Sequence, residues 1–149
     1  MNVGRVCTRE VATCTADQSV AEIAQLMRSG HVGDLVVVEY RSGDPVPIGI
    51  VTDRDLVIQV LAMEVNPARI TAGDIMSRKL VIAYEGEELD VAMDRMRWSG
   101  IRRIPLVDSA GALVGIATLD DIAELLALTL LNVSRVGRLQ HMDEENLRP

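Results

Sequence analysis

Apolar residues recur with a helical period at two separate places along the chain. The two sets share the spacing i, i+3, i+4, i+7 and comprise Val20, Ile23, Ala24 and Met27, then Leu89, Ala92, Met93 and Met96. This spacing predicts two amphipathic helices, each with one face on a core. Asp17 and Ser19 are both suitable N-caps for the first of them.

Short apolar runs predict strands around each of these helices. One run precedes each helix, at 11–12 and 80–83, and two follow it, at 35–38 and 48–51, then at 104–107 and 113–117. Runs without polar alternation are typical of strands covered on both faces. A second helix is expected from about Asp53 to Met63, and another from about Leu119 onwards. The predicted order is β-α-β-β-α, twice.

The two halves of the chain align with each other. Gly4 aligns with Gly73 and Met27 with Met96, an offset of 69, which falls to 66 where Gly49 aligns with Gly115. The difference is an insertion in the turn-rich segment "EYRSGDPVPIG", where extra residues are tolerated.

A unit of about 60 residues buries too little surface to be stable alone. We therefore predict an α/β (α+β) fold in which two β-α-β-β-α repeats, 1–66 and 67–130, pack with pseudo-two-fold symmetry around a cleft. Residues 131–149 are expected to form a C-terminal extension.

Composition restricts the partners of this chain. It has 149 residues, a formal net charge of −7 and 2% aromatic residues. A protein without a basic face has no general affinity for nucleic acid or for anionic membranes, so local arginines must hold any anionic ligand. The longest apolar run is too short to span a bilayer, and the N-terminus lacks the apolar region of a signal peptide. We expect a cytoplasmic protein in which Cys7 and Cys14 are buried or half-buried thiols.

One short motif occurs in both halves, as "GIVTDRDLV" and "GIATLDDIA". In each copy a Thr at a strand-to-helix turn is followed three residues later by an Asp. The first interpretation is a capping box, with Thr at the N-cap and the acid at N3. A capping box prefers Glu or Gln, however, and Asp has one methylene fewer with which to reach back.

The second interpretation is a ligand site. A glycine precedes each Thr by three residues, and a glycine in a strand often marks the close approach of another group. A carboxylate accepts hydrogen bonds from both hydroxyls of a vicinal diol such as ribose, and free N–H groups at a helix start can receive phosphate. The sequence leaves both interpretations open.

Together with "MRWSGIRRIPLVDSAGALVGI" and "AGDIMSRKLVIAYEGEEL", these motifs resemble tandem cystathionine-β-synthase (CBS) domain proteins over about residues 3 to 130. Such a pair of repeats is known as a Bateman module. The resemblance implies two units packed sheet to sheet, often as a homodimeric disc. It also implies that adenosine-containing ligands (AMP, ADP, ATP, NAD or S-adenosylmethionine) bind in the clefts between the units, without a catalytic cofactor.

The same resemblance implies the site residues. Asp55 and Asp121 would bind ribose hydroxyls, and Thr52 and Thr118 would contact ribose or phosphate. The remaining candidates would line the pocket or reach phosphate; they are Ile50, Val51, Ile116 and Ala117 for the pocket, and Arg102 and Arg103 for phosphate.

The two clefts are expected to be unequal. Gly33 and Asp34 stand where the second repeat has Arg102 and Arg103, and Asp34 would repel a phosphate. A solvated pair at a helix end remains the alternative reading of the two arginines. Arg54 either serves phosphate or pairs with the neighbouring Asp53.

The other polar residues give little support for catalysis. The two histidines, His31 and His141, lack the spacing of a metal cluster, and no nucleophile with a base can be assembled. The final helix is expected to end before Gly137, with apolar residues at 130–136 for a dimer contact and a frayed, polar end over the last nine residues. The leading hypothesis is a non-catalytic sensor acting on an unidentified protein partner. The alternatives are an interaction scaffold with degenerate clefts and an enzyme acting on a nucleotide.

Overall fold

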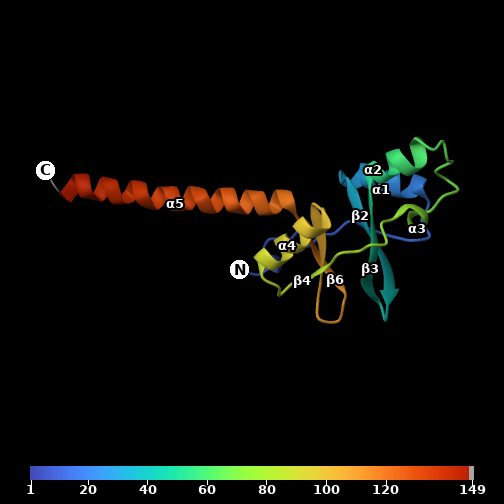
Figure 1. The fold of residues 1–149 in the computed structure, drawn as a ribbon, viewed down its shortest axis with the longest axis horizontal. Coiled ribbons are helices and arrows are strands. Elements are labelled where there is room, and N and C mark those ends of the chain that lie inside the picture. The colour runs from blue at the N-terminus through green and yellow to red at the C-terminus, as the bar shows by residue number, and fades with distance from the viewer. Residues whose placement is uncertain (148–149) are drawn as a thin grey trace.

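A computed structural model describes residues 1–147, with side chains as far as Val136. The first repeat contains β1 (Thr13–Thr15), α1 (Val20–Gly30), β2 (Asp34–Arg41), β3 (Asp44–Thr52), α2 (Asp53–Asp55) and its π-helical continuation η2 (Leu56–Leu61). The second contains β4 (Ala83–Tyr84), α4 (Leu89–Ser99), β5 (Arg103–Val107), β6 (Leu113–Thr118) and α5 (Leu119–Leu147). Short helices η1 (Val3–Arg5) and α3 (Ala72–Ile75) lie ahead of them (Figure 1). The predicted fold class is confirmed.

The two repeats form matching three-stranded sheets, β1-β2-β3 and β4-β5-β6. In each sheet the first pair of strands is parallel and the second pair is antiparallel. Even the register repeats, because Val37 lies opposite Gly49 and Leu106 lies opposite Gly115, with an irregularity directly after each pair. The internal repeat read from the sequence is therefore also a repeat of hydrogen bonding.

Both faces of these strands are covered, as the continuous apolar runs predict. Leu35 and Val37 pack towards α1 in the core of the first repeat. Val36 and Val38 face the opposite way and contact Ile116 of the second sheet. Helix α1 begins at Ser19, whose hydroxyl and backbone complete a capping box with Glu22. This identifies Ser19, and not Asp17, as the N-cap.

The repeats exchange their leading segments. Val3, in the leading segment of the first repeat, is buried in the core of the second, whereas Ala72 and Ile75, in the leading segment of the second repeat, are buried in the core of the first. Each segment then crosses the other sheet. Thr8 donates its N–H to Ile116 at 2.9 Å, and Ser77 donates to Ile50 at 2.9 Å.

These crossings explain why a glycine occurs at the same place in both repeats, as Gly49 and Gly115. A Cβ on Gly49 would lie 3.0 Å from the carbonyl oxygen of Ser77, and one on Gly115 would lie 3.2 Å from that of Thr8. A side chain at either place would crowd the crossing chain, whereas glycine lets the two backbones approach closely. The close approach expected at these glycines is real, but the approaching group is the chain itself.

One ion pair joins the repeats at equivalent positions. Arg103 at the start of β5 pairs with Asp34 at the start of β2, and their side chains are 31% and 22% exposed. Burial raises the pKa of Asp34, against the opposing effect of Arg103 and with a further rise from Asp53. A half-buried ion pair gives little net stabilisation because desolvation offsets the attraction, but loss of one partner is costly.

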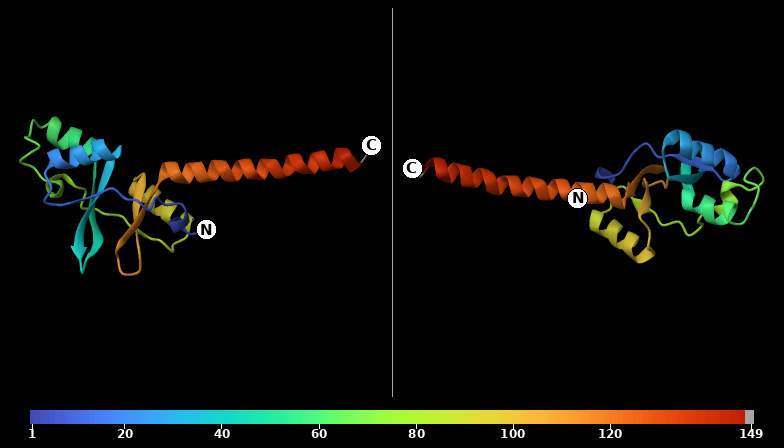
Figure 2. Two further views of the ribbon diagram at one scale, coloured as in Figure 1. Left: turned by 180° about the vertical axis from the view of Figure 1, so that it is seen from behind. Right: turned by 90° about the horizontal axis from the view of Figure 1, so that it is seen from above.

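Helix α5 leaves the body of the protein and projects away from it in every view (Figure 2). The sequence predicts that this helix ends before Gly137 and that the last nine residues are frayed. Both expectations are wrong as far as Leu147, because the backbone is helical up to that residue. One glycine costs a helix only about 1 kcal/mol relative to alanine, which a long helix of good formers tolerates. Leu130, Val133 and Val136 are exposed, as predicted. No helix within residues 1–147 is long and apolar enough to cross a membrane.

Replacing Gly4 by alanine should destabilise the exchanged N-terminal segment. Its Cβ would lie 2.6 Å from the carbonyl oxygen of Glu85, to which the Gly4 N–H also donates. We expect a loss of about 1–3 kcal/mol in the free energy of unfolding, measured in urea. Gly86→Ala is the matched control, since its Cβ would have no neighbour within 4 Å, and it should change stability by less than about 0.5 kcal/mol. Equal losses in both variants would contradict the crossing.

The Asp34–Arg103 pair should behave as a coupled pair in a double-mutant cycle. Asp34→Leu leaves a half-buried guanidinium without its anion, and Arg103→Met leaves a half-buried carboxylate without its cation. Each single variant should cost about 1–2 kcal/mol of unfolding free energy. The double variant Asp34→Leu/Arg103→Met replaces both charges by apolar groups and should lie within about 1 kcal/mol of the wild type. A double variant that loses as much as the single variants combined would show that the two residues do not interact.

Candidate functional site

A cleft of about 360 Å³ opens between the two repeats. It is lined by Ile50, Thr52, Arg54, Asp55, Ser77, Lys79, Leu80, Val81, Gly100, Ile101, Arg102 and Arg103. The first repeat supplies the end of β3 and the start of α2. The other wall comes from the segment that crosses β3 and from the turn between α4 and β5. Its volume is in the range of sites for small molecules.

Half of the residues proposed from the sequence meet in this cleft. Ile50, Thr52, Asp55, Arg102 and Arg103 all line it.

The other five lie elsewhere. Val51 and Ala117 are fully buried in the cores of their repeats, and Ile116 is buried between the sheets. Thr118 and Asp121 form the equivalent turn at the start of α5 and do not line this cleft.

The Thr–Asp motif is a complete capping box in both repeats. Oδ2 of Asp55 accepts the backbone N–H of Thr52 at 2.8 Å and its hydroxyl at 2.8 Å, while Asp55 donates its own N–H to Thr52 Oγ1 at 3.2 Å. Thr118 and Asp121 make the same three bonds at 3.0, 2.7 and 3.1 Å.

The expectation that aspartate is too short to close this box is therefore wrong. The backbone nitrogen of Thr52 and the carboxylate of Asp55 lie within 2.8 Å of each other, so the shorter side chain reaches the N-cap. A third box of the same type, which the sequence reading missed, is formed by Thr71 and Asp74 ahead of α3.

The backbone N–H groups at the start of α2 are already occupied. Asp53 donates to the carbonyl of Gly33 at 2.9 Å, and Arg54 donates to Oδ1 of Asp53 at 2.8 Å. The next N–H, that of Asp55, donates to Oγ1 of Thr52. The expectation that free N–H groups here receive phosphate is wrong, so side chains must hold any anion in this cleft.

Asp55 lines the cleft, and one of its two carboxylate oxygens takes no part in the cap. Oδ1 accepts a single hydrogen bond within the described residues, a long one of 3.3 Å from Nε2 of Gln59. Gln59 bonds the carbonyl of Ile75 more closely, at 3.0 Å. Because an ionised carboxylate oxygen can accept about two hydrogen bonds, Oδ1 can bind a hydroxyl while Oδ2 closes the cap. Capping and ligand binding therefore do not exclude each other.

The cations of the cleft differ in how they are engaged. Arg103 faces Asp34, and Arg102 pairs with the exposed Asp120 at 3.3 Å. None of the ion pairs or side-chain hydrogen bonds found in residues 1–136 involves the side chain of Arg54 or of Lys79. Arg54 uses only its backbone with Asp53, so the side-chain pairing weighed from the sequence is absent here.

Sequence reasoning missed the wall built from Ser77 to Val81. It read 80–83 as a strand alone, whereas Lys79, Leu80 and Val81 face the cleft because their segment crosses β3. The aligned position of Lys79 in the first repeat is Glu10, and this reversal of charge was the available signal.

The cysteines are free thiols, half-buried at Cys7 and buried at Cys14, as expected. Burial raises the pKa of Cys14 to about 11 and also raises that of Cys7, so both are protonated at neutral pH. No group of three or more His, Cys, Asp or Glu that could hold a metal ion is found in the described part of the chain.

Comparisons with known proteins agree with this architecture. The family model of the CBS domain matches residues 3–62 and 72–128. The chain is 40% identical over 125 residues to an uncharacterised protein of Methanopyrus kandleri, a match that covers 84% of this chain and 62% of that protein. It is 35% identical over 140 residues to the CBS domain-containing protein YhcV of Bacillus subtilis, and this match covers 94% of both proteins.

A solved structure with the same fold carries adenosine ligands. The CBS domain pair of protein MJ0100, in complex with 5′-methylthioadenosine and S-adenosyl-L-methionine, matches with a TM-score of 0.74 and 26% identity over 87% of this chain and 98% of that one. Sequence, register and overall structure thus lead to one assignment: the chain belongs to the CBS domain family and contains a tandem pair of its repeats.

Proposed function

We propose that this chain is a non-catalytic sensor that binds an adenosine-containing ligand in the cleft beside Asp55. The observation that carries the proposal is that Asp55 lines the cleft and uses only Oδ2 in the cap, which leaves Oδ1 with a single long hydrogen bond from Gln59 in residues 1–136. The adenosine compounds bound by the MJ0100 pair support the same ligand class.

Each part of an adenosine ligand has a chemically suitable neighbour in the cleft. Asp55 Oδ1 is an acceptor for ribose hydroxyls. Ile50, Leu80, Val81 and Ile101 form an aliphatic wall for the base. The lining contains no aromatic side chain, so the base would be held by apolar contact and backbone groups and not by stacking.

The cleft is suited to signalling because its walls belong to different repeats. A ligand seated there touches the end of β3 on one side and the α4–β5 turn on the other. Binding would therefore favour one relative placement of the repeats, provided that the ligand has different affinities for two placements. A protein partner that contacts both repeats would sense this difference.

The lining offers little for catalysis. It contains no His or Cys, and the hydroxyl hydrogen of Thr52 is donated to Asp55 within the cap. A nucleophile needs a base within hydrogen-bond reach. The one lining hydroxyl with such a base in residues 1–136 is that of Thr52, and both groups of that pair are engaged in the helix cap.

A ligand-independent scaffold is the second candidate. It is favoured by the box at Thr71 and Asp74, which shows that this motif can cap a helix outside the cleft. It is also favoured by the exposed Leu126, Leu130 and Val133 along α5, which would suit a homodimer contact.

Asp55→Ala and Asp74→Ala form a matched pair that separates the two functions. Each variant removes the N3 acid of a Thr-x-x-Asp cap, so each should lose about 1 kcal/mol of unfolding free energy. Thermal unfolding is then measured with AMP, ADP, ATP, NAD and S-adenosylmethionine. A ligand at a hundred times its dissociation constant should stabilise the wild type and Asp74→Ala by about 2.7 kcal/mol. Asp55→Ala should lose most of this gain.

Two results would contradict the sensor. An undiminished ligand effect in Asp55→Ala would remove Asp55 from the site. No effect of any of the five compounds on the wild type would favour the scaffold.

A further inference from the structure

The charged residues that line the cleft come from both repeats. At the positions related to them by the internal repeat, most of the charges are reversed. The sequence offsets relate Lys79 to Glu10 and Arg54 to Asp120. They also relate Arg103 to Asp34, its own ion-pair partner. Three cations of the cleft are thus replaced by acids across the pseudo-two-fold axis.

The contrast becomes complete when the remaining charged positions are added. The cleft is lined by four cations, namely Arg54, Lys79, Arg102 and Arg103, and by the carboxylate of Asp55. The equivalent positions hold four carboxylates, those of Glu10, Asp34, Asp120 and Asp121, together with the uncharged Gly33. Asp34 and Asp120 are paired with Arg103 and Arg102. Within residues 1–136 the cleft cations without an ion-pair partner are therefore Lys79 and Arg54, and the carboxylates without one at the equivalent positions are Glu10 and Asp121. A phosphate is favoured by the first two charges and opposed by the second two.

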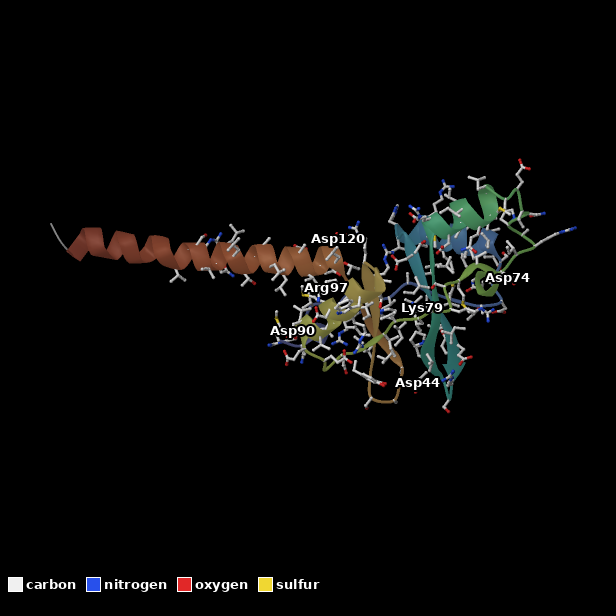
Figure 3. All side chains as sticks on the ribbon, in the orientation of Figure 1. Asp44, Asp74, Lys79, Asp90, Arg97 and Asp120 are labelled. Carbon is white, nitrogen blue, oxygen red and sulfur yellow. The ribbon has the colours of Figure 1, made fainter. Side chains whose placement is uncertain are left out.

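Two of the four cations are uncompensated. Arg103 faces Asp34 and Arg102 faces Asp120, whereas Lys79 and Arg54 have no side-chain ion pair or hydrogen bond within residues 1–136. Lys79 lies between the two halves of the protein, on the segment that crosses β3, while Asp120 lies at the start of α5 (Figure 3). The backbone of α2 offers no alternative, because its first N–H groups are occupied.

We propose that Lys79 and Arg54 bind the phosphate of an adenosine ligand, and that each chain binds one such ligand because the equivalent acidic surface excludes a second. This inference rests on the proposed function and names the ligand class and stoichiometry of that same site. Arg103, the candidate for phosphate from the sequence, lines the cleft and is already paired with Asp34.

Calorimetric titrations with AMP and adenosine test the proposal directly, because these compounds differ only in the phosphate. The wild type should bind one AMP per chain, at least about 10-fold more tightly than adenosine, as expected for charge-assisted contacts. Lys79→Glu and Arg54→Asp place at each position the residue of the other repeat. Each should weaken AMP at least about 10-fold and change adenosine affinity by less than about 2-fold.

Arg69→Glu is the control for overall charge. It changes the net charge by the same amount as Lys79→Glu, but on an exposed linker residue outside the cleft lining. It should therefore leave the affinities for AMP and for adenosine unchanged. Lys79 and Arg54 are themselves exposed, so all three variants should fold as the wild type does.

The outcomes separate this inference from the function on which it rests. Equal affinities for AMP and adenosine, or two AMP molecules per chain, would overturn the inference and leave an adenosine sensor. An effect of Arg69→Glu as large as that of Lys79→Glu would also overturn it. Failure of AMP, adenosine and the other adenosine compounds to bind the wild type would overturn the proposed function itself.

Discussion

The architecture depends on two reciprocal crossings, in which the leading segment of each repeat packs on the sheet of the other. Each crossing passes a strand position without a side chain, Gly49 or Gly115, where a Cβ would crowd the crossing chain. Each also ties one repeat to the core of the other, since Val3 lies in the second core and Ile75 in the first. The site depends on the same arrangement, because the chain that has crossed β3 becomes the wall that carries Lys79.

Asp55 caps a helix and also lines the cleft in which we propose that the ligand binds. A cap stabilises the fold by about 1 kcal/mol and uses one carboxylate oxygen. The second oxygen is left to accept other hydrogen bonds. The cap also holds the carboxylate still, which lowers the entropy lost when a ligand binds. In this chain the acid at Asp74 caps without facing the cleft, and the acid at Asp55 does both. The difference lies in position within the fold and not in the motif.

Local and periodic features were predictable from the sequence, whereas features that join distant segments were not. The helical period of Val20 to Met27 and the uninterrupted strand at 35–38 reflect burial, which leaves a direct trace in the residues. The repeat was also predictable, and with it the order of the elements. The exchange of leading segments was not, because nothing in the pattern of residues 3–8 says which core they enter.

The candidate site divides in the same way. The sequence identified Asp55 and Thr52 because a doubled motif is visible in one dimension. It assigned Arg103 to phosphate, although only the three-dimensional structure brings Asp34 against it. It also treated the N–H groups of α2 as free, because the carbonyl of Gly33 that occupies one of them lies on a distant segment. A single sequence does not reveal which charged or polar groups become paired with groups on distant segments.

A crystal structure of the chain with AMP would test the central claim most directly, namely that Asp55 caps α2 and binds the ligand with different oxygens. The account predicts AMP in the cleft, with a ribose hydroxyl on Oδ1 of Asp55, the phosphate at Lys79 and Arg54, and the bonds from Oδ2 to Thr52 intact. AMP bound elsewhere, or bound in the cleft without contact to Asp55, would contradict it.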